Sequence, residues 1–228
     1  MIKTIFFDLD NTLLDFTRAE AAALTRALRE LDAPAEPWVL ERYHVINQRQ
    51  WELLEEGALT REQVLTGRFS ILFRELGLAR DPAQICGRYE RYLSEGHWFV
   101  PGAEALLAEL SPRYALYLAS NGSAAVQHSR LKSAGIIPCF RDIFISQEMG
   151  ADKPSPEFFR RCFAAIPGFE KETALMVGDS LTSDIRGGIR AGIRTCWFHP
   201  EGGPARPDIR PDHTITALEQ LPKLLESL

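Results

Sequence analysis

The 228-residue sequence predicts an α/β fold in which a doubly wound parallel sheet carries a separate helical domain within one of its connections. Two observations lead to this prediction. Short apolar runs alternate with helical patterns, which is typical of a parallel sheet covered by helices on both faces. In addition, residues 16–96 have helical patterns alone, and an ordinary loop between a strand and a helix is far shorter.

Five apolar runs are the candidate strands of the sheet. They lie at residues 3–8, 115–120, 142–146, 174–177 and 195–198. Strands of a parallel sheet are buried on both faces, so they read as continuous apolar runs of this kind. Helices are expected between them, because residues 103–110 have apolar side chains at helical spacing and Ser155-Pro156 is typical of a helix start.

Residues 16–96 are expected to form the inserted domain. Thr60 and Gln63 have the spacing of a capping box, and Asp81-Pro82 is typical of another helix start. No strand-like run interrupts these residues. We therefore expect a core domain at residues 1–15 and 97–228 and an all-helical domain at residues 16–96.

Composition narrows the classes of protein to which the chain can belong. Hydrophobic residues make up 45% and charged residues 25%, as in ordinary globular proteins. A net charge of −5 argues against a nucleic-acid polymer as partner, and no apolar run approaches the roughly 18 residues that span a membrane. The four cysteines lie far apart and match no zinc-binding spacing, so we expect reduced thiols and a cytoplasmic protein.

Polar residues follow the candidate strands, where a doubly wound sheet places its ligand site. Asp8 and Asp10 end the first strand, Ser120 and Asn121 end the second, and Asp179 ends the fourth. Clustered carboxylates repel one another unless a cation lies between them, and Mg²⁺ prefers such hard oxygen ligands. A carboxylate can also attack phosphorus as a nucleophile. These residue types favour a magnesium site that binds a phosphorylated ligand.

Four motifs, in this order, resemble those of the haloacid dehalogenase (HAD) superfamily of phosphohydrolases: DLDNTL, SNG, KP and GDSLTSD. The resemblance covers the core domain, and the helical insertion after the first motif resembles the C1-type cap of subfamily I. It implies a magnesium-dependent phosphomonoesterase that acts through an aspartyl-phosphate. An aspartate at position 10 favours phosphoryl transfer over dehalogenation, because the dehalogenase members lack it.

The resemblance also implies a role for each motif residue. Asp8 would be the nucleophile that takes the phosphoryl group, and Asp10 would be the general acid and base. Ser120 and the amide of Asn121 would bind phosphate. Lys153 would contact both the phosphate and the nucleophile.

The metal site is implied in the same way. The carboxylates of Asp8 and Asp179 and the backbone carbonyl of Asp10 would bind Mg²⁺. Thr12 would support the turn after the first strand. Asp184 would bond to the motif lysine or to metal-bound water, or alternatively favour the start of a helix through its charge.

Parts of the helical domain resemble the bacterial 5′-nucleotidase branch that hydrolyses pyrimidine nucleoside monophosphates. The stretches that carry this resemblance are residues 43–51, 55–57 and 68–69, and residues 178–200 of the core domain are similar to the same branch. It implies that Asn47, Trp51 and Arg68 contact the substrate, and the position of Phe16 at the domain hinge suggests a wall for the leaving group. The alternative for the first three is packing and ion pairing inside the helical domain.

Other functions stay open at this point. The same motifs would serve a phosphatase for phosphoglycolate or a sugar phosphate, a phosphomutase of the β-phosphoglucomutase type, or a binding module that has kept the fold. In each case the expected partner is a small phosphorylated metabolite, with a nucleoside monophosphate favoured. Neither a membrane nor a nucleic-acid polymer is expected, and the chain would be a monomer or a homodimer.

Overall fold

A computed structural model describes residues 1–203 and 206–228, and its central feature is a six-stranded sheet. The strands are β1 (Thr4–Phe7), β2 (Ala115–Ser120), β3 (Asp142–Ile145), β4 (Ala174–Gly178), β5 (Arg194–Phe198) and β6 (His213–Ile215). Their order in the sheet is β3-β2-β1-β4-β5-β6, and every neighbouring pair is parallel. The predicted doubly wound parallel sheet is confirmed.

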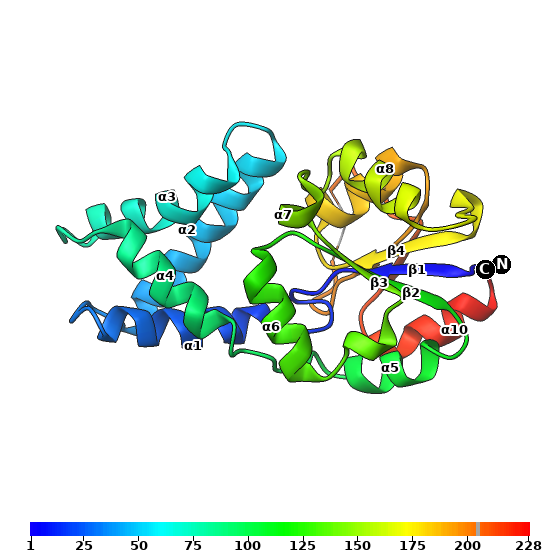
Figure 1. The fold of residues 1–228 in the computed structure, drawn as a ribbon, viewed down its shortest axis with the longest axis horizontal. Coiled ribbons are helices and arrows are strands. Elements are labelled where there is room, and N and C mark those ends of the chain that lie inside the picture. Colours follow the sequence, from blue (N-terminus) through cyan, green and yellow to red (C-terminus); the bar gives the residue numbers. More distant parts are fainter. Residues whose placement is uncertain (204–205) are drawn as a thin grey trace. The chain divides into compact units, whose positions relative to one another are not determined.

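The sheet is buried on both faces because the side chains of each strand alternate between two apolar clusters. Ile5 and Phe7 of β1 belong to one cluster, and Phe6 belongs to the other. Figure 1 shows α5 (Ala103–Leu110) and α10 (Leu221–Glu226) on the first face and α8 (Pro156–Ala165) on the second. This two-sided burial is why the strands read as continuous apolar runs.

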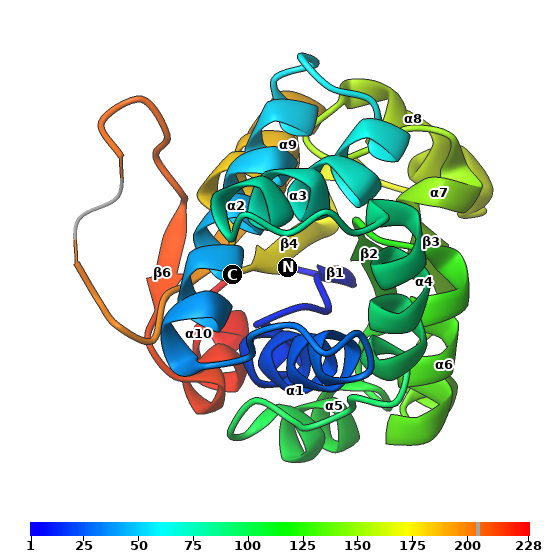
Figure 2. The same cartoon turned by 90° about the vertical axis from the view of Figure 1, so that its left-hand side faces the viewer.

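The prediction missed β6, which pairs with β5 at the outer edge of the sheet (Figure 2). This strand has three residues, and only Ile215 among them is buried. An edge strand that is short and largely exposed has no continuous apolar run, so the criterion that found the other five strands does not detect it.

The remaining helices of the core connect these strands. They are α6 (Ala124–Ala134), α7 (Ser146–Met149) and α9 (Arg186–Ala191), with short helical turns at Ile137–Cys139, Lys171–Thr173, Leu181–Ile185 and Leu218–Gln220. As predicted, the hydroxyl of Ser155 accepts from the backbone N–H of Glu157 and caps α8. No helix among the described residues is long and apolar enough to cross a membrane.

The chain divides into two compact units, one of Met1–Asp15 with His97–Leu228 and the other of Phe16–Gly96. The second unit holds α1 (Phe16–Arg29), α2 (Pro37–Glu55), α3 (Arg61–Glu75) and α4 (Pro82–Leu93). All of its residues are described, and none of them lies in a strand.

Two helices of the second unit, α3 and α4, begin where the sequence predicts. The hydroxyl of Thr60 accepts from the backbone N–H of Gln63, whose side chain accepts from Thr60 in return. The carboxylate of Asp81 caps α4 by accepting from Ala83.

Candidate active site

Asp8 continues β1 by one residue, because its backbone N–H donates to the carbonyl of Val177 in β4 at 2.9 Å. The chain then turns sharply, and Asn11 adopts a φ of 56°, a left-handed conformation that asparagine tolerates better than most residues. This turn brings the buried hydroxyl of Thr12 to 3.5 Å from Asp8 and 3.4 Å from Asp179. The backbone N–H of Asp179 also donates to that hydroxyl, so Thr12 ties the ends of β1 and β4 together.

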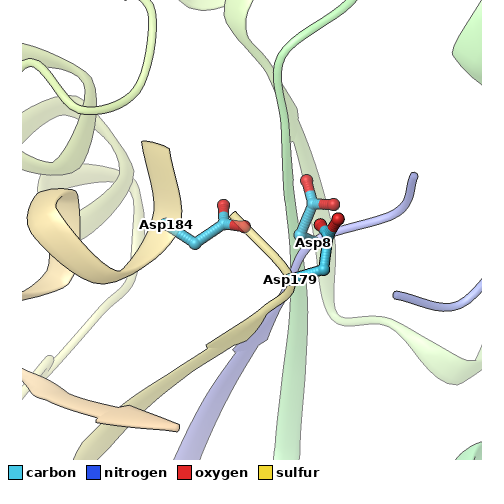
Figure 3. Close-up of side chains that lie close together, drawn as sticks. All are labelled: Asp8, Asp179 and Asp184. Atoms are coloured by element: carbon cyan, nitrogen blue, oxygen red, sulfur yellow. The ribbon is translucent and has the colours of Figure 1, made fainter. Parts of the chain in front are cut away.

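Three carboxylates meet at this edge of the sheet (Figure 3). One oxygen each of Asp8, Asp179 and Asp184 lies within 4.8 Å of the others. Asp8 and Asp179 follow β1 and β4, whereas Asp184 comes from the helical turn that β4 leads into. The backbone N–H of Ser180 donates to Asp184 and fixes that side chain.

Gly178 makes the approach of Asp184 to the sheet possible. A Cβ atom at residue 178 would lie only 2.2 Å from a carboxylate oxygen of Asp184. The glycine at the start of the fourth motif therefore leaves room for the third carboxylate of the cluster.

Lys153 is the cation that contacts this cluster. Its side chain is 1% exposed, and its Nζ donates to Asp8 at 2.7 Å and to Asp184 at 2.6 Å. Burial alone would lower the pKa of Lys153, but the charges of Asp184 and Asp8 outweigh burial and raise that pKa. The ammonium thus stays charged and bridges two of the three carboxylates.

The cluster keeps an excess of negative charge despite this lysine. Burial, supported by the charges of Asp184 and Asp10, raises the pKa of Asp8 to about 7. Burial and the neighbouring carboxylates also hold the pKa of Asp179 well above its usual range. A divalent cation among these oxygens would favour their ionised forms, and carboxylate oxygens are the ligands that Mg²⁺ prefers.

Asp10 points its carboxylate at α6 and is not part of the three-carboxylate cluster. One of its oxygens accepts from Gln127 at 2.7 Å, and the other accepts from the buried guanidinium of Arg130. Gln127 also donates to the hydroxyl of Ser120 at 2.9 Å. The ends of β1 and β2 are therefore joined through one helix face.

Asn121 uses its side-chain amide inside the protein. Its oxygen accepts from the backbone N–H of Lys153, and its nitrogen donates to the carbonyl of Lys153 and to Ser183. The side chain thus fixes the backbone of the lysine. A phosphate contact by Asn121 would have to come from its backbone N–H.

Comparison with known proteins decides the family. A model of the haloacid dehalogenase-like hydrolase family matches residues 2–192. The chain belongs to this family. The predicted resemblance is therefore confirmed, and the chain is a hydrolase.

Relatives of this HAD hydrolase match it along almost the whole chain. It is 41% identical to the HAD-hydrolase YfnB of Bacillus subtilis over 98% of this chain and 95% of the relative. It is 38% identical to pyrimidine 5′-nucleotidase PynA of Streptococcus pneumoniae, over 96% and 93% of the two chains. It is 30% identical to pyrimidine 5′-nucleotidase YjjG of Escherichia coli, over 97% and 96%.

A solved structure supports the same conclusion. The crystal structure of YfnB, described as bound to magnesium and as revealing interdomain movement, matches this HAD hydrolase with a TM-score of 0.94. The match has 41% sequence identity and covers 98% of each chain.

Two of the substrate-contact candidates lie inside a buried polar network of the helical unit. Asn47 donates to Glu20 at 2.7 Å and accepts from Arg68 at 2.9 Å, and each of these three residues is 3% exposed. His44 contacts the other oxygen of Glu20 at 2.6 Å. These contacts favour the packing alternative for Asn47 and Arg68.

The other two candidates are less confined. Trp51 is half-buried beneath the guanidinium of Arg61, whose central carbon lies 5.5 Å from the ring centroid. Phe16 is half-buried at the first position of α1.

Sequence reasoning missed Gln127, Arg130 and Trp197. The indole N–H of Trp197 donates to the backbone carbonyl of Asp179 at 2.7 Å and so fixes the loop after β4. In the sequence, Gln127 and Arg130 look like an ordinary solvent-facing pair on a helix, and Trp197 looks like an ordinary apolar residue of a strand. Their place in the site is revealed by the contacts that Gln127 and Arg130 make with Asp10 and that Trp197 makes with Asp179.

Proposed function

We propose that this HAD hydrolase is a magnesium-dependent phosphomonoesterase that acts through an aspartyl-phosphate on Asp8. The observation that carries the proposal is the cluster of three carboxylates, two of which Lys153 bridges, together with Asp10, whose charge acts on Asp8. The excess negative charge of the cluster calls for a cation, and a phosphoryl group beside that cation would face a buried nucleophile.

The residues would divide the reaction into two steps. Lys153 contacts Oδ1 of Asp8 at 2.7 Å and the Thr12 hydroxyl lies 3.5 Å from Oδ2, so the carboxylate is oriented at both oxygens when one of them attacks phosphorus. The bond from phosphorus to the ester oxygen breaks, and the leaving oxygen takes a proton from Asp10. Water then attacks the phosphorus of the acyl phosphate, Asp10 takes the water proton, and phosphate and free Asp8 are restored.

Other groups would stabilise the charge that the phosphoryl group carries in these steps. Lys153 and the Ser120 hydroxyl lie at the same edge of the sheet as Asp8 and can contact phosphoryl oxygens. Asp8, Asp179 and the backbone carbonyl of Asp10 would hold Mg²⁺, while Asp184 would hold Lys153 in place. When bound, Mg²⁺ neutralises the carboxylates and withdraws charge from the phosphoryl oxygens.

We propose a pyrimidine nucleoside monophosphate as the substrate and Phe16–Gly96 as the cap that covers it. Two relatives that match almost the whole chain, PynA and YjjG, are named pyrimidine 5′-nucleotidases. Trp51 and Phe16 remain the cap candidates for substrate contact, since Asn47 and Arg68 have partners inside the helical unit. The four cysteines, all free thiols, support the cytoplasm as the compartment.

The test is phosphate release with Mg²⁺ from UMP, dUMP, dTMP, AMP, GMP, phosphoglycolate, glucose phosphates and p-nitrophenyl phosphate. We expect kcat/KM for the pyrimidine nucleotides to exceed kcat/KM for the other natural esters by about tenfold or more. A pocket that hydrogen-bonds the base discriminates strongly against esters that lack those groups. Asp8→Asn should abolish release from all of them. A preference for glycolate or sugar phosphates would overturn the substrate, and a product that retains the phosphoryl group would indicate a mutase.

A further inference from the structure

One face of α6 connects two of the residues that the proposed reaction uses. Gln127 and Arg130 lie about one turn apart on this helix, and they are 2% and 0% exposed. Both point at the edge of the sheet where β1 and β2 end, because they contact Asp10 and Ser120. Buried polar and cationic side chains of this kind need partners, and here the partners belong to the site.

Gln127 uses every hydrogen-bonding group of its side chain. Its Nε2 donates to Asp10 at 2.7 Å and to the hydroxyl of Ser120 at 2.9 Å, and its Oε1 accepts from Arg130 at 3.0 Å. A flipped amide would place an oxygen against a carboxylate and a nitrogen against a guanidinium, so a single orientation is favoured. Since Ser120 accepts from Gln127, its own proton can be donated to a ligand.

The second motif leaves space for this amide. A Cβ atom at Gly122 would lie 2.9 Å from Nε2 and 3.0 Å from Cγ of Gln127. A larger residue at position 122 would therefore displace Gln127 from the contacts that it makes with Asp10 and Ser120.

Arg130 restrains the second oxygen of Asp10. With Gln127 on one oxygen and the buried guanidinium on the other, the carboxylate has a donor on both sides. Rotation of the carboxylate about its last bond would break both contacts at once. Each oxygen can still accept another hydrogen bond, so the group can exchange a proton while it is held.

We infer that Gln127 and Arg130 are positioning residues that fix the proton-carrying carboxylate of Asp10 and the phosphate-binding hydroxyl of Ser120. This inference rests on the proposed function, because it requires Asp10 to exchange a proton with the leaving group and with water. The two residues touch neither substrate nor metal in this scheme. They act by holding two groups that do.

The inference predicts that the effect of removing Arg130 depends on the leaving group. An alkyl phosphate such as UMP needs a proton on its leaving oxygen, whereas p-nitrophenolate leaves without one. In Arg130→Met, transfer from p-nitrophenyl phosphate to Asp8 should therefore stay fast while water attack on the acyl phosphate becomes slow. Stopped-flow absorbance should show a burst of about one p-nitrophenolate per enzyme followed by a slow steady rate.

The experiment compares Arg130→Met, Arg130→Lys and Gln127→Met with the wild-type chain and with Lys132→Met, an exposed cation on the same helix. We expect kcat for UMP to fall about 10- to 100-fold in Arg130→Met with KM changed less than threefold, with partial recovery in Arg130→Lys. Gln127→Met should show the same pattern. In this variant Asp10 and Arg130 still contact each other, so neither charge loses its partner of opposite sign. Lys132→Met should match the wild type.

Three outcomes would overturn the inference. One is wild-type or faster turnover in both Arg130→Met and Gln127→Met. Another is a p-nitrophenolate burst in Arg130→Met whose amplitude falls in proportion to the steady-state rate, because that result would indicate only that less of the enzyme is folded. The third is an equal loss for UMP and p-nitrophenyl phosphate without a burst. If the wild-type chain releases phosphate from no ester, the proposed function itself fails, which is a distinguishable result.

Discussion

The two compact units of this HAD hydrolase both bury charged side chains, but they balance the charges differently. In the helical unit, Asn47 bridges the acid of Glu20 and the guanidinium of Arg68, and His44 contacts the same acid. Arg68 also lies over the ring of Tyr89, 5.0 Å from its centroid. Each buried charge of this network has partners within the unit.

The core unit leaves its buried charge unbalanced. Of the three clustered carboxylates, only Asp8 and Asp184 contact Lys153, whereas Asp179 does not. The pKa values of Asp8 and Asp179 are raised because burial and mutual repulsion oppose their ionisation. The comparison teaches that burial of charge alone does not identify a reactive site. A balanced network holds helices together, whereas a surplus of one sign indicates a site that can bind a counter-ion or ligand.

The largest expected effect comes from removing Asp8, the proposed nucleophile. We expect Asp8→Asn to lower kcat for phosphate release about a thousandfold or more, because the asparagine amide cannot take the phosphoryl group. Its thermal midpoint should stay equal or rise, since one buried negative charge is gone. Asp142→Asn, at an exposed aspartate of β3, is the matched control for both measurements. If Asp8→Asn loses stability as well as activity, the core cluster does not carry a destabilising surplus of charge, and the proposed difference between the two units is wrong.

The stability that Mg²⁺ adds to the core unit should depend on pH, because the carboxylates of the cluster must lose their protons to bind the ion. Because the pKa of Asp8 is raised, the contribution of this one group to the stability of the metal-free fold is complete below its usual pKa of 3.8 and is lost as the pH rises through about 7. A fixed Mg²⁺ concentration, about 100 times the Kd at pH 7, should add roughly 3 kcal/mol at that pH, or about 5–10 °C in thermal midpoint. Calorimetry should show a larger gain at pH 7 than at pH 5 and a much smaller one in Asp8→Asn. A gain that does not change with pH would contradict this account.

The balanced network should behave in the opposite way. Arg68→Met removes a charged hydrogen bond to Asn47, so we expect the helical unit to lose about 2 kcal/mol of unfolding free energy. The rate with p-nitrophenyl phosphate should change less than twofold. Urea unfolding followed by tryptophan fluorescence, to which Trp38 and Trp51 of this unit contribute, measures the loss. Arg49→Met, at a side chain that is 53% exposed, is the control.

A different result would revise the interpretation of Arg68. If Arg68→Met leaves the unfolding free energy unchanged and raises KM for UMP alone, the residue contacts substrate as the family resemblance implied. The distinction between a structural and a functional network would then fail for the helical unit.

The smallest effect concerns His44. The hydrogen bond to Glu20 raises the pKa of this imidazole above its usual 6.5, so its stabilising contribution is complete below pH 6.5 and is lost as pH rises through the raised value. Because the side chain is 43% exposed, the contribution should stay below about 1 kcal/mol. Unfolding free energies at pH 6 and pH 9 should differ less in His44→Gln than in the wild type. An identical difference would exclude His44 as its source.

The sequence predicts much of the fold because each local signal agrees with the final environment. The buried strands read as apolar runs, and the capping residues Thr60, Asp81 and Ser155 mark real helix starts. The exposed edge strand β6 lacks such a signal. Sheet topology explains why the residues at strand ends meet, since parallel strands bring their carboxyl ends to one edge.

The remainder of the site depends on partners that the sequence does not reveal. Gln127 and Arg130 lie 117 and 120 residues from Asp10, and a polar pair on a helix ordinarily faces solvent. Trp197 fits packing in a strand until its indole N–H is seen to meet Asp179. These residues are recognisable only after the chain has folded.

The most direct test of the central claim is to trap the phosphoryl group on the core cluster. The enzyme would be mixed with Mg²⁺ and UMP, quenched in acid during turnover, reduced with borohydride and digested for mass spectrometry. An acyl phosphate on Asp8 would be converted to homoserine at that position, which is the result this account predicts. Rapid phosphate release with an unmodified Asp8, or with the label on another residue, would contradict it.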